Sequence, residues 1–432
     1  MDAIKEAITS FYNGTGISDL IAHPDLGIKT LIMYVIVGVL FYLGIVKKFE
    51  PLLLIPIATG MLLANLPGTE MFHISWFIDG VPTGVLDANG DPVLSESMRD
   101  IIAHAVSQGG LIDILYLGVK LGVYPSLIFM GVGALTDFGP MLRNLKLAIF
   151  GAAAQMGIFA VLLISLLVGF TPQEAASLGI IGGADGPTAI FTTIKLAPHL
   201  LGPIAIAAYS YMALVPVIIP LVVRLLCSEK ELRINMKEQD RLYPDGTEIK
   251  NMRVLKIIFP IAVTTIVAIF VPSAVSLVGM LMFGNLVKEI GNDTSRLFDA
   301  ASNGVMNAAT IFLGLCVGAT MTVDAFINVQ TLGIVAGGFC AFALSIASGI
   351  CMVKVWNLFA KKKINPLIGA TGLSAVPMAS RVCNIISTKY DPKNHVLNYC
   401  MSSNISGVIG SAVAAGVLIS FLGIIYLILN SV

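Results

Sequence analysis

The chain has few charged residues. Only 12% of its 432 residues are charged, 56% are hydrophobic, and the positive and negative side chains cancel to a formal net charge of zero. A soluble domain carries about 25% charged residues, so this composition predicts a polytopic membrane protein rather than a soluble enzyme. A nucleic-acid partner would require a basic face, and the balance of charges argues against one.

The sequence also lacks the spacings that mark metal sites and disulfide frameworks. Five histidines are dispersed, and no CxxC or CxxH pair occurs among the six cysteines. Scattered cysteines in apolar segments are typical of small core side chains, although a disulfide or metal role is the alternative. We therefore expect no tightly bound metal and no flavin.

Apolar segments of spanning length recur along the chain, at about 30–46, 111–130, 147–170, 203–226, 254–271, 306–327, 331–355 and 404–429. Because about 20 residues cross the hydrocarbon core, we predict an all-α polytopic membrane protein with about 9–11 transmembrane helices. Some of these helices are expected to be discontinuous or re-entrant, and the chain is expected to form two structurally related halves.

The polar segments predict where these halves begin and end. We predict an amphipathic or surface segment at 1–29, a first membrane half at 30–226, a charged cytoplasmic loop at 227–253 and a second membrane half at 254–432. The connection 65–110 has six acidic residues and one basic residue, so the positive-inside rule places it outside.

Each half contains two segments that glycine and proline should break. They are 131–142 and 178–196 in the first half, and 276–287 and 364–381 in the second. Paired broken segments in corresponding positions are typical of a transporter site formed where two repeats meet. The alternative is that glycine-rich membrane helices look alike because small residues allow close packing.

The most informative stretch is GGADGPT at 182–188. Three glycines (Gly182, Gly183 and Gly186) and a proline cannot continue a regular helix, and a carboxylate at membrane depth indicates a functional site. Asp185 is therefore our first candidate for a cation ligand. Asp137, in the other broken segment of this half, is either functional or a turn residue at the cytoplasmic face.

The late stretch NPLIGATGLSAVPMASR at 365–381 offers neutral oxygen ligands, which suit a hard monovalent cation. Asn365 supplies an amide and Ser374 a hydroxyl, although Asn365 also fits a helix cap. Arg381 requires a carboxylate partner, unless it is an interfacial arginine. Two residues outside this stretch, Tyr211 in the middle of its span and Asn404 at the start of the last span, are further polar candidates.

Three strings resemble, in this order, the signature blocks of one family: GVGALTDFGPML at 131–142, GIIGGADGPTAIF at 179–191 and NPLIGATGLSAVPMASRV at 365–382. The family is the β subunit of the biotin-dependent sodium-pumping decarboxylases, which act on oxaloacetate, malonate, methylmalonyl-CoA or glutaconyl-CoA. The resemblance implies a primary active transporter, a translocase that decarboxylates carboxybiotin, takes up a proton and exports sodium.

The resemblance also implies roles for individual residues. The catalytic set would be Asp185, Tyr211 and Arg381, with Tyr211 as the proton donor or relay. Carboxybiotin would be bound by Arg381, Asn365 and Gly369. Sodium would be bound by Asp185, Asn365, Ser374 and Tyr211, and we add Asn404 to this set.

The partners implied are a biotin-carrier subunit, a carboxyltransferase (α) subunit that selects the acid, and small membrane subunits (γ and δ). The complex would hold this chain as a homo-oligomer in the bacterial cytoplasmic (inner) membrane. Two other functions fit the same residues. One is a secondary sodium-coupled carboxylate transporter with Arg381 as the substrate ligand, and the other is a membrane scaffold.

Overall fold

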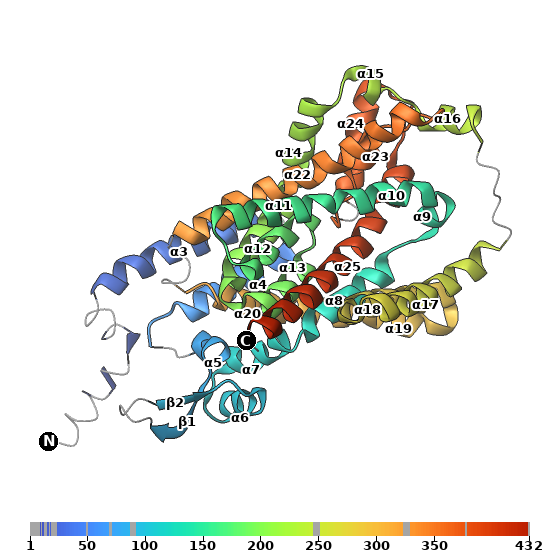
Figure 1. Ribbon diagram of the computed structural model, residues 1–432. Coiled ribbons are helices and arrows are strands. Elements are labelled where there is room, and N and C mark those ends of the chain that lie inside the picture. The colour runs from blue at the N-terminus through green and yellow to red at the C-terminus, as the bar shows by residue number, and fades with distance from the viewer. Residues whose placement is uncertain are drawn as a thin grey trace. The chain divides into compact units, whose positions relative to one another are not determined.

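The computed structural model describes residues 9, 11–12, 15–16, 18, 24–48, 51–68, 71–86, 92–244, 251–322, 329–375 and 378–430. The chain is mainly helical (Figure 1). It divides into two compact units. One unit holds Met1–Tyr124, Leu201–Pro203 and Asn307–Leu332, and the other holds Pro125–Leu200, Ile204–Met306 and Gly333–Val432. This mainly helical, membrane-type architecture, with one two-stranded sheet among the described residues, confirms the predicted fold class, whereas the two related halves stay a prediction.

The smaller unit combines apolar helices with the polar connection at 65–110. Its elements are α3 (Pro24–Ile45), α4 (Pro51–Ala64), α5 (Ile74–Ile78), β1 (Val81–Leu86), β2 (Pro92–Ser95), α6 (Met98–Gln108), α7 (Leu111–Lys120) and most of α20 (Met306–Ala319). The two strands pair antiparallel, with Val81 opposite Ser95. The acidic connection is therefore a folded hairpin-and-helix segment in its described part.

The larger unit contains the remaining elements, apart from the first residues of α8, α14 and α22. They are α8 (Val123–Leu135), α9 (Gly139–Arg143), α10 (Leu145–Ala154), α11 (Met156–Val168), α12 (Pro172–Gly179), η1 (Ile180–Gly183), α13 (Gly186–Leu196), η2 (Pro198–Leu200), α14 (Leu201–Leu226), α15 (Glu229–Leu232), α16 (Met236–Leu242), α17 (Met252–Phe270), η3 (Pro272–Ala274), α18 (Val275–Ile290), η4 (Asn292–Thr294), α19 (Ser295–Asp299), η5 (Ala300–Val305), α22 (Val329–Phe359), α23 (Leu367–Ala370), α24 (Met378–Tyr390) and α25 (Leu397–Asn430).

Within the described residues, six helices are long and apolar enough to cross a membrane, and two bent helix pairs bring the number to eight if each pair is one span. The shorter apolar helices Thr30–Ile45 and Pro51–Ala64 add to these. Exposed leucine, isoleucine, valine and phenylalanine side chains cover much of their outer surface, as a lipid-facing surface requires. The protein is therefore a multi-pass membrane protein.

The last helix, α25, is central to the packing of the larger unit and runs beside α10 (Figure 1). Small residues permit this contact: a methyl group on Gly151 would overlap Ser406 and the Ser403 carbonyl, and one on Gly407 would overlap the Gly372 carbonyl. Helices associate in membranes through such close approach of backbones. The packing brings α25 against both the 178–196 segment and the 364–381 segment.

Three of the four predicted breaks are present. Residues 136–138 separate α8 from α9, residues 184–185 separate η1 from α13, and 371–375 follow the four-residue α23 without regular structure. The fourth prediction is wrong, because 276–287 lies inside the continuous helix α18. Its Gly284 serves close packing instead, since a methyl group there would overlap the Met130 carbonyl.

Candidate functional site

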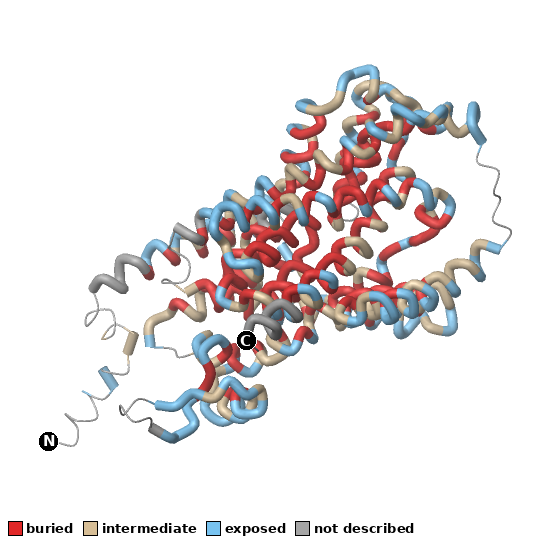
Figure 2. Tube along the Cα trace, viewed as in Figure 1, coloured by how far each residue is buried: buried red, intermediate tan, exposed pale blue. Residues whose placement is uncertain are grey.

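The Asp185 segment is enclosed by protein on all sides. Every residue from Ala175 to Ile194 is buried except Pro187, which is half-buried (Figure 2). Thr171 caps α12 by accepting a hydrogen bond from the Glu174 amide, and the helix tightens into η1 before it ends. Non-helical backbone at membrane depth is tolerated only inside such a protein environment.

The backbone turns sharply just before Asp185. Ala184 adopts a left-handed conformation with φ 56° and ψ 40°, which is uncommon for a residue other than glycine. Asp185 then caps the N-terminus of α13, where its Oδ1 accepts a hydrogen bond of 3.3 Å from the Thr188 amide. The positive end of the α13 dipole therefore offsets part of the cost of burying this carboxylate.

The two broken stretches meet at Asp185. The Ser411 hydroxyl on α25 donates to Asp185 Oδ2 at 3.2 Å and lies 2.9 Å from the Ser374 hydroxyl. The Ser374 amide in turn donates to the Gly183 carbonyl at 2.9 Å. Asp185, Ser374 and Ser411 thus form one connected polar cluster, in which Asp185 is only 8% exposed.

Two amide side chains hold the irregular backbone that follows α23. Asn404 Nδ2 donates to the carbonyls of Thr371 (3.1 Å) and Leu373 (2.6 Å). Gln155 Nε2 donates to the carbonyl between them, that of Gly372, at 3.2 Å. Three consecutive carbonyls freed from helical bonding are therefore satisfied by side chains. The Asn404 Oδ1 atom is buried and has no hydrogen-bond partner among the described residues.

The predicted glycines are sites of close packing. A methyl group would lie 2.8 Å from the Ser345 hydroxyl if placed on Gly182, and 3.0 Å from Ser411 Cβ if placed on Gly183. At Gly186 it would overlap the ring of Tyr209, and at Gly369 it would overlap the Gly349 carbonyl. These glycines are required because other chain segments press against the site.

The structure does not bring Asn365 into the Asp185 cluster. Its Nδ2 donates to the carbonyls of Leu232 (2.9 Å) and Ile234 (3.0 Å), and its Oδ1 accepts from the Leu367 amide at 3.0 Å. These contacts join the start of the late stretch to the charged loop between α15 and α16.

None of the remaining predicted residues has a described contact with this cluster. Arg381 is exposed on α24. Tyr211 lies on α14, but its side chain is outside the described residues. Asp137 is a turn residue: its Oδ1 accepts from the Gly139 amide at 2.9 Å and pairs with Lys256 Nζ at 2.6 Å. Burial raises the pKa of Asp137, but Lys256 and the Gly139 amide outweigh it, so this pKa lies below its usual value.

Sequence reasoning missed two residues of the site, Ser411 and Gln155. Each carries a weak signal that was available. Ser411 lies seven residues after Asn404, so both occupy one face of the last helix. Gln155 is an amide in the middle of a 24-residue apolar span, Leu145–Val168, where a polar side chain needs a partner.

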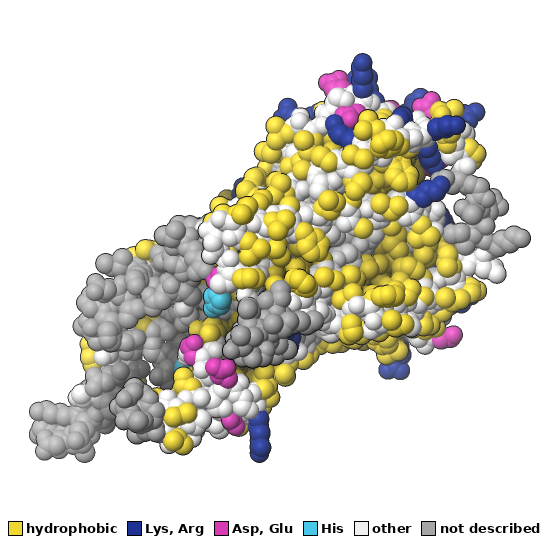
Figure 3. Space-filling model, in the orientation of Figure 1, with side chains coloured by type: hydrophobic (Ala, Val, Ile, Leu, Met, Phe, Trp, Pro, Cys, Tyr) yellow, Lys and Arg dark blue, Asp and Glu magenta, His cyan; other side chains and the backbone are white. Residues whose placement is uncertain are grey.

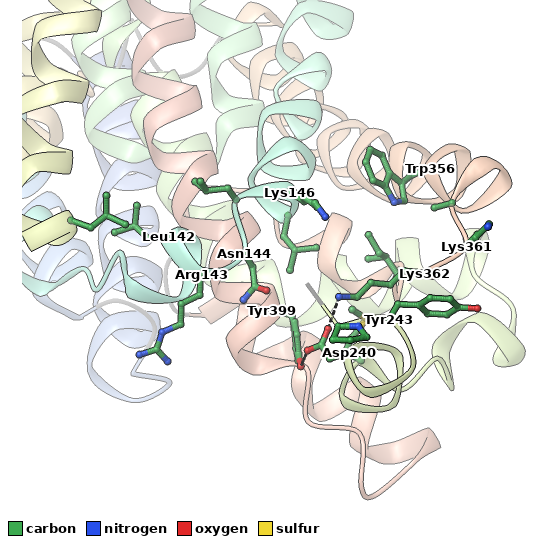
Figure 4. Close-up of a pocket in the computed structure, with 17 residues that line it drawn as sticks. Leu142, Arg143, Asn144, Lys146, Asp240, Tyr243, Trp356, Lys361, Lys362 and Tyr399 are labelled. Carbon is green, nitrogen blue, oxygen red and sulfur yellow. Dashed lines mark hydrogen bonds and ion pairs between the residues drawn. The ribbon is translucent and has the colours of Figure 1, made fainter. Parts of the chain in front are cut away.

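A cavity of about 690 Å³ lies at the end of this unit where α16, α22 and α25 begin or end (Figure 4). Its walls include Trp356 and Met236, and it is also lined by four basic residues, Arg143, Lys146, Lys361 and Lys362. Lys362 pairs with Asp240 at 2.7 Å, and Tyr399 donates to the same carboxylate at 2.5 Å. A second hollow of about 560 Å³ shares Arg143, Asn144, Asp240 and Tyr399 with it.

Lysine and arginine side chains gather at the end of the unit marked by α15 (Figure 3). In membrane proteins such an excess marks the cytoplasmic side. Asn365 adjoins the cavity at this end. Its neighbour Ile364 lines the cavity, and the Asn365 backbone amide donates to the sulfur of Met236, which also lines it.

The chain matches the family described as the Na+-transporting oxaloacetate decarboxylase beta subunit over residues 29–422. It belongs to this family. The methylmalonyl-CoA decarboxylase subunit beta of Propionigenium modestum is 48% identical over 97% of this chain and 100% of that protein. The β chain 2 of oxaloacetate decarboxylase from Salmonella typhi is 43% identical over 96% and 99% of the two chains. The glutaconyl-CoA decarboxylase subunit beta of Acidaminococcus fermentans is 42% identical over 98% and 100%.

These findings confirm the resemblance found in the sequence. The chain is a β subunit of the sodium-transporting decarboxylase family, a decarboxylating and sodium-translocating membrane subunit. Among the described residues no group of three or more histidine, cysteine, aspartate or glutamate side chains could hold a metal ion. The Asp185 cluster differs from such sites because it pairs one carboxylate with neutral oxygens.

Proposed function

We propose that this β subunit decarboxylates carboxybiotin and carries sodium through the Asp185 cluster. The observation that supports the sodium site is a buried carboxylate whose described hydrogen-bond partners, Ser411 and the Thr188 amide, are uncharged. A buried carboxylate without a fixed cation is costly. A sodium ion bound by Asp185, Ser374 and Asn404 would neutralise it, and freed backbone carbonyls are the other ligands that transporters use.

The reaction would begin at the cytoplasmic cavity. Its basic residues suit an anion, and we propose that carboxybiotin reaches it on a separate biotin-carrier subunit. Of the two roles expected for Asn365, its place beside the cavity favours contact with carboxybiotin over contact with sodium. Arg381 would engage the carboxylate as a charge-assisted donor, and Gly369 would keep the late stretch close to α22.

Decarboxylation breaks the bond between the biotin nitrogen and the carboxyl carbon, so CO2 leaves and the nitrogen takes a proton. We propose Tyr211 as the donor or relay of this proton, with sodium occupancy lowering the cost of its ionisation. The α subunit, the carrier and the small γ and δ subunits would complete the complex, with this chain present as a homo-oligomer in the bacterial inner membrane. Family membership does not favour the secondary carboxylate transporter.

The test is sodium-22 uptake into proteoliposomes that contain the purified complex with its biotin carrier. The acid that the complex decarboxylates should drive uptake by the wild type, and Asp185→Asn should abolish it. Asp137→Asn is the matched control, because Asp137 also follows a broken helix but pairs with Lys256. Normal pumping by Asp185→Asn would refute the site, and carboxylate-coupled uptake by this chain alone would refute the pump.

A further inference from the structure

Gln155 is a buried amide whose side-chain oxygen has no role in the account above. It joins α10 to α11 in the middle of the apolar span Leu145–Val168 and is 6% exposed. Burying an amide without hydrogen bonds costs about 2–7 kcal/mol. Both the NH2 group and the oxygen of this side chain therefore need a polar partner.

The nitrogen side of the amide has a clear role. Nε2 lies within hydrogen-bond distance of three backbone carbonyls, those of Gly151 (3.3 Å), Gly372 (3.2 Å) and Gly407 (3.4 Å). Carbonyl oxygens only accept hydrogen bonds, so the NH2 group must be the side that faces them. This fixes the orientation of the side chain and directs its oxygen the opposite way.

The oxygen side lies beside Gly183, next to a residue of the Asp185 cluster. A methyl group built on Gly183 would lie 3.0 Å from Ser411 Cβ, 3.4 Å from Ile158 Cδ1 and 3.6 Å from Gln155 Oε1, so Gln155 and Ser411 both border the space beside Gly183. Oε1 is buried and has no hydrogen-bond partner among the described residues. An unsatisfied buried acceptor costs about 1–3 kcal/mol, and a cation in this space would satisfy it.

We propose that Gln155 Oε1 is a further neutral ligand of the transported sodium ion, together with Asp185 and Ser411. The inference rests on the sodium site proposed above and deepens it. One amide would then have two tasks. Its nitrogen holds the irregular backbone at Gly372 in place, and its oxygen contributes to the cation site that this backbone helps to form.

The test must separate the ligand role from the tether. Sodium affinity is measured from the rise of the thermal unfolding midpoint with sodium concentration, in detergent, at constant ionic strength with potassium as the replacing ion. Gln155→Leu removes both the tether and the oxygen. Asn285→Leu is the matched control, because Asn285 Nδ2 also donates to two carbonyls (Gly133 and Thr136) and its Oδ1 is also unpartnered, but it lies on α18.

Both leucine variants should unfold at a lower temperature in potassium. Only Gln155→Leu should also weaken sodium binding, by about tenfold or more, the loss typical when support of a metal site is removed. Wild-type sodium affinity in Gln155→Leu would overturn the proposal while leaving the Asp185 site intact. If the wild type itself does not respond to sodium, the sodium site and this proposal both fail.

A second variant tests the ligand role if Gln155→Leu does not fold. Gln155→Glu retains an oxygen facing Gly183 and adds a charge when it ionises. An ionised glutamate cannot donate to the Gly372 carbonyl, so this variant also loses the tether, but the charge on its oxygen should make sodium affinity rise more steeply with pH than in the wild type. A pure tether predicts the same pH slope as the wild type, and that result would overturn the ligand role.

Discussion

Three contacts hold the Asp185 carboxylate in position. Asp185 caps α13 and follows Ala184, whose backbone is strained. Its carboxylate also accepts a hydrogen bond from the Ser411 hydroxyl, on a helix more than 200 residues away in sequence. Strained backbone persists at functional sites because the surrounding structure over-determines it. The same surroundings hold the carboxylate in one position, which a selective cation site requires.

Ser411 gives a prediction at this scale. Ser411→Ala removes the hydroxyl that joins Asp185 to Ser374, so the sodium concentration for half-maximal decarboxylation by the complex should rise about tenfold. The maximal rate at saturating sodium should change little. Ser420→Ala on the same helix is the control, because Ser420 contacts Ser273, which also donates to the Gly416 carbonyl. An unchanged sodium requirement in Ser411→Ala would show that this hydroxyl does not serve the site.

At the scale of elements, the site depends on helices that approach each other closely. Gly349 on α22 and Gly369 at α23 face one another, and a methyl group on either would overlap the carbonyl of the other. This contact keeps the short α23 and the irregular stretch after it in place. The glycines of the late stretch thus serve packing as well as backbone freedom.

Gly349→Ala should therefore lower the thermal unfolding midpoint, because overpacking typically costs about 1–3 kcal/mol. Gly333→Ala is the control on the same helix, where the added methyl group has no neighbour within 4 Å. Alanine is favoured over glycine in a helix by about 0.5–1 kcal/mol, so the control should be neutral or stabilising. Equal midpoints for the two variants would contradict the close contact.

The sequence predicted the helical membrane class and three of the four breaks, and it singled out Asp185 as the first candidate ligand, which stays a prediction. These features depend on composition and on glycine and proline chemistry, which are local. It did not predict that Ser411 pairs with Asp185 or that Gln155 holds the Gly372 carbonyl, because pairings across 226 or 217 residues leave no local pattern. The break expected at 276–287 was wrong for a related reason. Gly284 allows close packing against a neighbouring helix, and the local sequence does not reveal that contact.

At the scale of the whole molecule, the larger unit holds both a buried polar cluster and a basic cavity. The late stretch connects them, since Asn365 adjoins the cavity and Ser374 belongs to the cluster. A movement of this stretch would therefore change both the cavity and the polar cluster. Because sodium would join the residue between α10 and α11, the start of α13, the late stretch and α25, its binding should stabilise the folded state as a whole.

The most direct test of the sodium site is the thermal unfolding of the purified chain in sodium and in potassium, with wild type beside Asp185→Asn. A ligand that binds only the folded state stabilises it by about 2.7 kcal/mol at a hundredfold excess over Kd. Sodium, and not potassium, should raise the wild-type midpoint, and Asp185→Asn should lose this rise. A sodium-dependent rise of equal size in both proteins would place the ion elsewhere and contradict the role given to Asp185.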